Sequence, residues 1–505
     1  MEKEKESGEA ARADFHLLRD PAVGRERVMR ILSALESESG KYLSGWISES
    51  REYGQTYPGQ GLLTTPYDYL GETALRMLPV EKAIETLRLR MFFLMMFNHP
   101  YRVGFLEGVN GRPFVPPGKI RGDALGEAFA AGVSLAIGDI GAAVTGAGNG
   151  RVSRGERYAQ GPFVKLGRQA RNCFVGSASP DVWNNAWAIA TMAACHSLAS
   201  LPRNGVMVEV TRQVDLAKQV FKILGEMEEV ILGGREDRER VAGYWRHNVM
   251  GTLESVSAKA LGRAEKLYEA GVRVFRVYSP EPGREVEETV KAVRAEFGGE
   301  IEIFAGQVVE VGQGKSIEER GADGIVLGVG GGGRCITGVR SGSVVEWPEL
   351  VWKLRGEIGI PMVVEGGASD HVAVSLLLGV SGIGVSRAVA GGTVESPGGF
   401  LYCSDDKGRM FKPYGGEASA RTKYVEGKLL PFEVPSFVEG ETGMAEMSYV
   451  KHALPTLTYN LHLLTEDAIL ALVFRGVTSI EELQAIDPSP LRRMTASGVY
   501  QAGVH

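Results

Sequence analysis

The last two-thirds of the chain alternates short, almost continuously apolar runs with longer amphipathic stretches. The apolar runs are predicted strands: Val206–Val210, Val272–Tyr278, Ile301–Phe304, Gly324–Leu327, Pro361–Val364 and Gly382–Val385. The amphipathic stretches between most of them are predicted helices: Ser257–Glu269, Glu285–Phe297, Trp347–Glu357 and Asp370–Leu378. Strands that are apolar on both faces and alternate with helices indicate a parallel sheet covered by helices.

A glycine stands between several predicted helices and the strand that follows, at Gly271, Gly321 and Gly379. Glycine readily adopts the left-handed conformation that ends a helix. Repetition of this unit favours an α/β fold of the closed (β/α)8 type, a TIM barrel, over an open sheet. Ligands of such barrels bind at the C-terminal ends of the strands.

Residues 1–160 follow a different pattern. Helical periodicity is evident in Gly24–Leu43 and Val80–Met96, and a glycine-rich stretch covers Gly132–Gly150. This segment is longer than the lead-in to a barrel requires. We therefore expect a mainly helical N-terminal region over residues 1–160 and a barrel over residues 161–505.

Composition narrows the function. The chain has 505 residues with a formal net charge of −6, and its basic residues are interspersed with acidic ones, so we expect no binding to nucleic acid. The charged N-terminus does not resemble a secretory signal and no apolar run is long enough to span a membrane, which predicts a cytoplasmic protein. The four cysteines form no CxxC pair, which argues against a zinc site or a disulfide framework.

The glycine content, 67 residues, is concentrated where predicted strands end. Gly324–Leu327 is followed by Gly328-Val329-Gly330-Gly331-Gly332-Gly333-Arg334-Cys335, and Pro361–Val364 by Glu365-Gly366-Gly367. Glycine lets backbone N–H groups approach an anion such as phosphate. A Cys335 thiolate could attack an electrophilic carbon there, with Thr337 positioning a second reactant. The alternative is a buried loop cysteine without chemistry.

Four segments, in order, resemble the IMP dehydrogenase/GMP reductase family. The family patterns are SAxMD, AGNVV, GADxxxxGxGxGSxCxT, and the series DGG, EExPG and YxGMxS. They are matched by Ser177–Asp181, by Ala305–Val309, by Gly321–Thr337, and by Glu365–Gly367 with Glu395–Gly398 and Tyr414–Ser419. The resemblance covers about residues 170 to 480.

The resemblance implies a purine mononucleotide oxidoreductase. Cys335 would attack C2 of the purine and form a thioimidate, and a hydride would pass to or from NAD or NADP. Thr337 would help to activate water in the dehydrogenase direction or ammonia in the reductase direction. Glu439 is the candidate for the catalytic glutamate, with Glu426 as the competing alignment. A homotetramer is expected by the same resemblance.

The resemblance also implies binding residues. The purine nucleotide would contact Ser177, Gly332, Gly333, Glu365, Gly367, Arg387, Tyr414, Gly416 and Glu417. The nicotinamide cofactor would contact Ser279, Gln307, Gly328 and Gly330. A monovalent cation such as K⁺ would be held by Gly330, Gly332 and the carbonyl of Cys335.

Several positions depart from the family pattern. Glu365 replaces the aspartate that holds the ribose hydroxyls, and Gly333 replaces a phosphate-binding serine. Arg387-Ala388 replaces a glycine-serine pair, so a guanidinium could bind the phosphate instead. Gln307 replaces the asparagine of AGNVV. The strand that usually ends in an aspartate for the cofactor reads Val277-Tyr278-Ser279-Pro280-Glu281.

These last two changes keep two other functions open: a non-redox cysteine enzyme acting on a purine-like nucleotide, and a non-catalytic nucleotide-binding regulator. Regulatory CBS modules are not expected, because residues 224–250 leave no room for them. The interval from Ser419 to Glu439-Gly440 resembles the short loop of the reductases.

Overall fold

The computed structural model describes residues 74–78, 80–121, 124–131, 140–142, 161–177, 179–279, 284–332, 334–404, 407–446, 456–497 and 500. The helix predicted at Gly24–Leu43 lies outside the described residues, as does most of the stretch Gly132–Gly150. The helix predicted at Val80–Met96 is confirmed as α5, Val80–Phe97.

Eight parallel strands form a closed barrel in the order β10-β11-β12-β5-β6-β7-β8-β9. The strands are β5 (Phe174–Gly176), β6 (Ala199–Leu201), β7 (Val249–Leu253), β8 (Val274–Tyr278), β9 (Glu302–Val308), β10 (Gly324–Leu327), β11 (Met362–Val364) and β12 (Gly382–Val385). The predicted (β/α)8 barrel is therefore confirmed.

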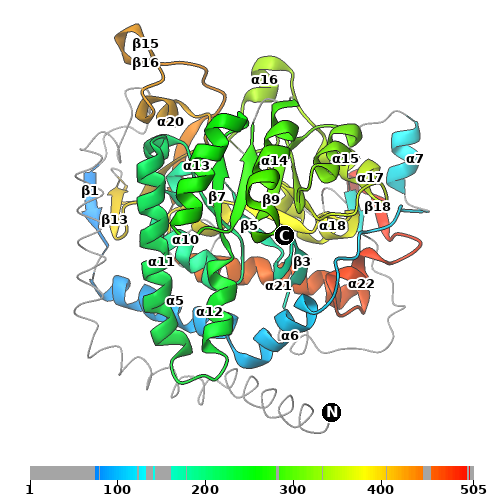
Figure 1. Ribbon diagram of the computed structural model, residues 1–505, viewed down its shortest axis with the longest axis horizontal. Helices are drawn as coiled ribbons and strands as arrows, with labels where there is room; N and C mark the ends of the chain where they lie inside the picture. Colours follow the sequence, from blue (N-terminus) through cyan, green and yellow to red (C-terminus); the bar gives the residue numbers. More distant parts are fainter. Residues whose placement is uncertain are drawn as a thin grey trace.

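Helices cover the outside of this barrel (Figure 1). They include α10 (Ala186–Ala194), α11 (Val210–Leu232), α12 (Arg238–Arg246), α13 (Ser257–Glu269), α14 (Arg284–Phe297), α15 (Val311–Glu319), α17 (Trp347–Leu354), α18 (Val372–Leu378), α21 (Leu457–Arg475) and α22 (Ile480–Gln484). Their apolar faces pack against strands that are buried at every position except Gly384 of β12, so strands and helices share one continuous core.

The strand predicted at Val206–Val210 is wrong. The chain forms a 3-10 turn at Gly205–Met207 and then enters α11 at Val210. The strand of this unit is β6, whose sequence Ala-Ser-Leu has little of the β-branched character that marks strands. Val206, Val208 and Val210 stand at alternate positions just before and at the start of an amphipathic helix, and this alternation is also typical of a strand.

The described N-terminal helices pack directly on the barrel. Leu94 and Phe97 of α5 belong to the same apolar core as the barrel strands, as does Val103 of α6 (Pro100–Asn110). A short strand, β2 (Ile140–Ala142), pairs antiparallel with β18 (Leu491–Arg493) near the other end of the chain. The division between residues 160 and 161 stays a prediction.

A second sheet lies beside the barrel. Its strand order is β1 (Ala74–Met77), β13 (Leu401–Ser404), β14 (Met410–Gly415) and β17 (Thr442–Glu446), and all its pairs are antiparallel. This sheet carries the last predicted site residues: Tyr414 lies in β14, and Glu439 lies shortly before β17. None of the helices in the described part of the chain has the length and apolar character needed to cross a bilayer.

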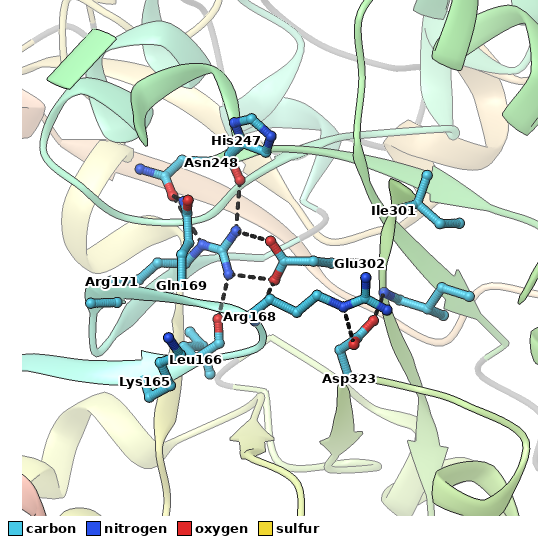
Figure 2. Close-up of polar contacts among 12 residues, drawn as sticks. Lys165, Leu166, Arg168, Gln169, Arg171, His247, Asn248, Ile301, Glu302 and Asp323 are labelled. Atoms are coloured by element: carbon cyan, nitrogen blue, oxygen red, sulfur yellow. Dashed lines mark hydrogen bonds and ion pairs between the residues drawn. The ribbon is translucent and has the colours of Figure 1, made fainter. Parts of the chain in front are cut away.

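The N-terminal end of the barrel is closed by the hairpin of β3 (Phe163–Leu166) and β4 (Gln169–Asn172), which carries a buried ion pair (Figure 2). Arg171 donates from Nη1 to Glu302 Oε2 at 2.7 Å and from Nη2 to Glu302 Oε1 at 2.8 Å. We call Arg171 and Glu302 the floor pair. Burial alone would raise the pKa of Glu302, but the charge and hydrogen bonds of Arg171 outweigh it and hold that pKa below its ordinary value.

Candidate active site

The loops after β10 and β11 pack backbone against backbone at the C-terminal end of the barrel. Gly328 has a φ of 120°, and a Cβ there would lie 2.1 Å from the carbonyl oxygen of Glu365. Gly366 has a φ of 90°, and a Cβ there would lie 2.8 Å from the Gly332 nitrogen. Glycine is therefore required at both positions. This close approach brings the cysteine loop beside Glu365.

Cys335 lies at the start of a chain of three polar side chains. Its Sγ is 3.2 Å from Thr337 Oγ1, and Thr337 Oγ1 is 3.0 Å from Glu439 Oε2. The thiol donates to the hydroxyl and the hydroxyl donates to the carboxylate. A proton can thus pass from the thiol side of the site to Glu439.

The backbone holds these residues together. Cys335 forms an antiparallel bridge with Gly440, and the Ile336 N–H donates to the Glu439 carbonyl at 2.8 Å. A second bridge joins Gly440 to Ser419, the N-cap of helix α20 (Ala420–Val425). The segment carrying Glu439 is therefore fixed against the cysteine loop on one side and against α20 on the other.

Glu426, the competing candidate, is engaged elsewhere. Its Oε1 accepts the Gly205 N–H at 2.9 Å, and its Oε2 lies 2.8 Å from Lys428 Nζ. Of the two glutamates, the structure brings Glu439 to Thr337.

The other three cysteines are buried, whereas Cys335 is partly exposed. Burial raises the pKa of Cys403 to about 12 and raises the pKa of the Cys173 and Cys195 thiols further. Because the thiolate is the nucleophile, these three thiols are inert in the folded chain. Cys335 is therefore the reactive candidate among the four.

Glu365 forms a second buried ion pair at the mouth of the barrel. Arg276 of β8 donates from Nη1 to Glu365 Oε1 at 2.7 Å and from Nη2 to Glu365 Oε2 at 2.6 Å. We call Arg276 and Glu365 the mouth pair. Burial disfavours the charged guanidinium, but attraction to Glu365 outweighs it and raises the pKa of Arg276 above its ordinary value.

The remaining predicted nucleotide residues line strand ends and the second sheet. Ser177, after β5, shares a hydrogen bond with Ser386, which also accepts from Trp183 Nε1 at 3.2 Å. The guanidinium carbon of Arg387, after β12, is 6.0 Å from the centroid of the Tyr414 ring. The other five predicted nucleotide residues are Gly332, in the cysteine loop, and Gly333, Gly367, Gly416 and Glu417.

Gly367 follows the mouth pair with a φ of 82°. The Gly416 carbonyl accepts Thr422 Oγ1 at 2.9 Å in the turn into α20. Burial raises the pKa of the Tyr278 phenol well above its ordinary value, and the negative charge of nearby Glu417 raises it further. Gly333 lies outside the described residues.

Two of the four predicted cofactor residues, Ser279 and Gln307, meet at the ends of β8 and β9, whereas Gly328 and Gly330 lie in the loop after β10. The Ser279 N–H donates to the Gly306 carbonyl at 3.0 Å, and the Gln307 N–H donates to the Ser279 carbonyl at 3.2 Å. Tyr278, which precedes them, is buried beside two guanidinium groups. Its ring centroid is 4.3 Å from Arg276 and 6.0 Å from Arg203, which follows β6.

Among the described residues, no group of three or more histidine, cysteine or acidic side chains is placed to bind a metal ion. The predicted cation ligands are backbone carbonyls. Of these, the Gly332 oxygen accepts the Cys335 N–H at 2.8 Å within the loop.

The comparisons with known proteins agree with this geometry. A family model described as the IMP dehydrogenase / GMP reductase domain matches residues 169–505. The chain belongs to the IMP dehydrogenase/GMP reductase family. The predicted family is thereby confirmed, and the match covers all eight barrel strands.

Three curated relatives are inosine-5'-monophosphate dehydrogenases. That of Aquifex aeolicus is 29% identical over 272 residues, which are 51% of this chain and 52% of the relative. That of Cryptosporidium parvum is 27% identical over 266 residues, 50% of this chain and 62% of the relative. That of Mycobacterium leprae is 26% identical over 272 residues, 51% of this chain and 50% of the relative. The chain thus spans about half of the length of most of these relatives.

Sequence reasoning missed two arginines of this family member's site. Arg276 carried a signal, since a charged residue stands inside the apolar run Val-Phe-Arg-Val-Tyr of a strand buried on both faces. Arg203 carried none, because the strand before it was not predicted. Ser386 was also missed, and its role as the partner of Ser177 depends on β5 and β12 being neighbours in the barrel.

Proposed function

We propose that the chain is a purine mononucleotide oxidoreductase that acts through a covalent bond between Cys335 and C2 of the purine. The observation that carries the proposal is the hydrogen-bonded series Cys335, Thr337 and Glu439 at the barrel mouth of a family member. A nucleophile needs a base within hydrogen-bond reach, and this series supplies one.

The nucleotide would lie across the glycine loops of β10 and β11. Glu365 would accept hydrogen bonds from the ribose hydroxyls, and Gly332, Gly333 and Gly367 would offer N–H groups to the phosphate. Arg387 would supply the positive charge opposite the phosphate. Ser177, Tyr414, Gly416 and Glu417 would complete the pocket.

In the dehydrogenase direction Cys335 loses its thiol proton to solvent through Thr337 and Glu439, Sγ bonds to C2, and the hydrogen on C2 departs with its electron pair as the hydride that a nicotinamide cofactor would accept. Water then adds to C2, the carbon–sulfur bond breaks, and the thiolate takes a proton from solvent to restore the thiol. Thr337 takes a proton from that water and passes its own proton to Glu439. In the reductase direction the same groups return a proton to departing ammonia.

A nicotinamide dinucleotide, NAD or NADP, would accept or supply the hydride when bound. The side chains at the ends of β8 and β9 fit a carboxamide, because the amide of Gln307 and the hydroxyl of Ser279 can each donate and accept. Gly328 and Gly330 would let the ring approach the backbone. A monovalent cation would use the carbonyls of Gly330, Gly332 and Cys335, since a carbonyl that accepts one N–H keeps a second lone pair.

A second function has an observation in its favour. Tyr278 stands where the family usually has an aspartate, and its buried ring packs beside Arg203 and Arg276. Tyr278 and Ser279, the described residues at that strand end, therefore offer hydroxyl groups rather than a carboxylate to a cofactor ribose. A non-redox cysteine enzyme would keep the nucleotide pocket and Cys335 without the dinucleotide.

Turnover assays with purified protein separate these functions. Wild type is tested with IMP and NAD or NADP, and with GMP and reduced NAD or NADP, by following reduced nicotinamide. Cys335→Ala should lower turnover by about a thousandfold or more. Thr337→Val should lower it by about a hundredfold to ten-thousandfold at unchanged nucleotide affinity.

Wild type that binds a purine monophosphate but turns over none of these pairs would refute the redox proposal. Mass spectrometry would then distinguish the two other functions: a nucleotide adduct on Cys335 would support a non-redox enzyme, and its absence would support a binding protein.

A further inference from the structure

The mouth pair spans the interior of the barrel. Arg276 lies in the middle of β8, level with Thr252 of β7 and Phe304 of β9. Glu365 follows β11, and β9 and β10 separate these two strands around the barrel. The ion pair therefore links two strands of the wall that are not neighbours.

The two partners are not equally buried. The Arg276 side chain is 1% exposed and the Glu365 side chain is 14% exposed. The guanidinium lies inside, and the carboxylate is the end of the pair that a ligand can reach. Arg276 can therefore act on a ligand only through Glu365.

The pair leaves hydrogen-bonding capacity on its accessible end. A carboxylate has about four lone-pair positions. Arg276 uses one on each oxygen, and no other donor among the described residues contacts the Glu365 carboxylate. One position per oxygen remains, which is what two neighbouring hydroxyl groups of a ribose would fill.

The guanidinium itself is fixed in place. Its central carbon lies 4.3 Å from the centroid of the Tyr278 ring, a distance at which cation and ring attract. Two parallel N–H donors then set the plane of the carboxylate as well as its charge. A glutamate is longer and more flexible than the family's aspartate, so fixing its orientation lowers the cost of ordering it on binding.

We propose that Arg276 is a positioning residue that orients Glu365 toward the 2′- and 3′-hydroxyls, and so makes the site selective for ribonucleotides over 2′-deoxyribonucleotides. The proposal rests on the proposed function in one respect, that the ligand is a purine nucleotide. It does not require turnover.

The test is a binding cycle measured by calorimetry on the full chain. IMP and GMP are each compared with the 2′-deoxy form, in wild type and in Arg276→Gln. Wild type should bind the ribonucleotide about tenfold to a hundredfold more tightly, because one hydrogen bond to a charged group is lost in the deoxy form. In Arg276→Gln this ratio should fall to about threefold or less.

Arg263→Gln is the matched control. Arg263 of α13 pairs with Glu254 after β7, and their side chains are 5% and 19% exposed, so this pair is buried to a similar degree. Arg263 has no part in the proposed pocket. The control variant should lose stability but keep the ribose preference of wild type.

If Arg276→Gln does not fold, Arg276→Lys and the double variant Arg276→Gln/Glu365→Gln replace it. Lysine keeps the charge without the two parallel donors and should give an intermediate ratio, and the double variant should give no preference. A wild-type preference that survives in Arg276→Gln or Arg276→Lys overturns the proposal.

Equal binding of the ribo and deoxy forms by wild type also overturns the proposal, as does the absence of purine nucleotide binding. Tight, ribose-selective binding without turnover would instead refute only the redox function. If the protein turns over a purine nucleotide, its kinetics give a further test. Arg276→Gln should then raise KM for the nucleotide while kcat stays nearly constant.

Discussion

The barrel carries a buried arginine–glutamate pair at each end, and the two pairs differ in how fully their hydrogen bonds are used. In the floor pair, Arg171 also donates to Asn248 Oδ1 at 3.0 Å, to the His247 carbonyl at 2.8 Å and to the Leu166 carbonyl. Glu302 accepts a further bond from the Arg168 N–H at 2.9 Å (Figure 2).

The mouth pair makes only its two mutual bonds. The Nε of Arg276 has no partner, and in the described part of the chain the carboxylate of Glu365 meets no second donor. A buried pair with every group satisfied stabilises the fold, whereas a pair with unused acceptors holds capacity for a ligand. On our proposal, the same two residue types would serve structure at one end of the barrel and ligand recognition at the other.

The largest expected difference between the ends is in stability. Arg171→Gln should lower the free energy of unfolding by about 3–5 kcal/mol, because it leaves the Glu302 carboxylate buried without its counterion. Arg276→Gln should cost less, since Glu365 is partly exposed and can reach water. Urea unfolding followed by circular dichroism measures both.

Lys353→Gln is the control for that comparison. Lys353 pairs with Glu349 on the surface of α17, where their side chains are 51% and 31% exposed. Its loss should change stability by about 0.5 kcal/mol or less. If Arg276→Gln destabilised the chain as much as Arg171→Gln, the contrast between the two ends would be lost.

Acid should lower the stability of the chain in part through the floor pair. The pKa of Glu302 is lower in the folded state than its ordinary value of 4.5, so its contribution to stability is fully present above that pH. The contribution is lost as pH falls through the folded pKa. Urea unfolding at a series of pH values should show this loss in wild type.

The pH series has its own test variant. In Arg171→Gln, burial without the counterion raises the pKa of Glu302, so the Glu302 contribution to the acid dependence should reverse in sign. An identical acid profile in wild type and variant would show that Glu302 does not titrate as the structure indicates.

The smallest perturbation is chemical labelling of thiols. A small alkylating agent should modify Cys335 in the folded protein and leave Cys173, Cys195 and Cys403 unmodified until the chain is unfolded, because the last three are buried. Peptide mass spectrometry after timed quenching measures the four rates. Bound IMP should slow the alkylation of Cys335. Equal alkylation rates at Cys335 and Cys403 in the folded protein would contradict the assignment of Cys335 as the reactive thiol.

The strands that the sequence predicted are those with strong local signals. Gly324–Leu327 and Gly382–Val385 were predicted with the observed bounds, as was the helix Ser257–Glu269. β5, β6 and β7 were not predicted. β5 and β6 have only three residues each and include glycine, alanine or serine, which have weak strand preference, and β7 is interrupted by Gly251. Barrel closure stabilises such strands through neighbours that no local pattern reveals.

The same division applies to the candidate site. Cys335 and Thr337 stand in one recognisable motif, so their proximity could be predicted from the resemblance. Glu439 could not be separated from Glu426 by sequence, because the choice depends on which loop meets Thr337. The mouth pair could not be predicted at all, since its residues are 89 positions apart and meet only across the closed barrel.

The two bridges at Gly440 have a mechanical consequence. Because Gly440 is joined to Cys335 on one side and to Ser419 on the other, the segment bearing the proposed base, Glu439, is held directly to the loop bearing the proposed nucleophile, Cys335. A Cβ on Gly440 would lie 3.1 Å from the Ser419 nitrogen, which leaves this joint little tolerance. Cys335 and Glu439 would therefore move as one body. The distance between them would change little when other loops of the mouth move.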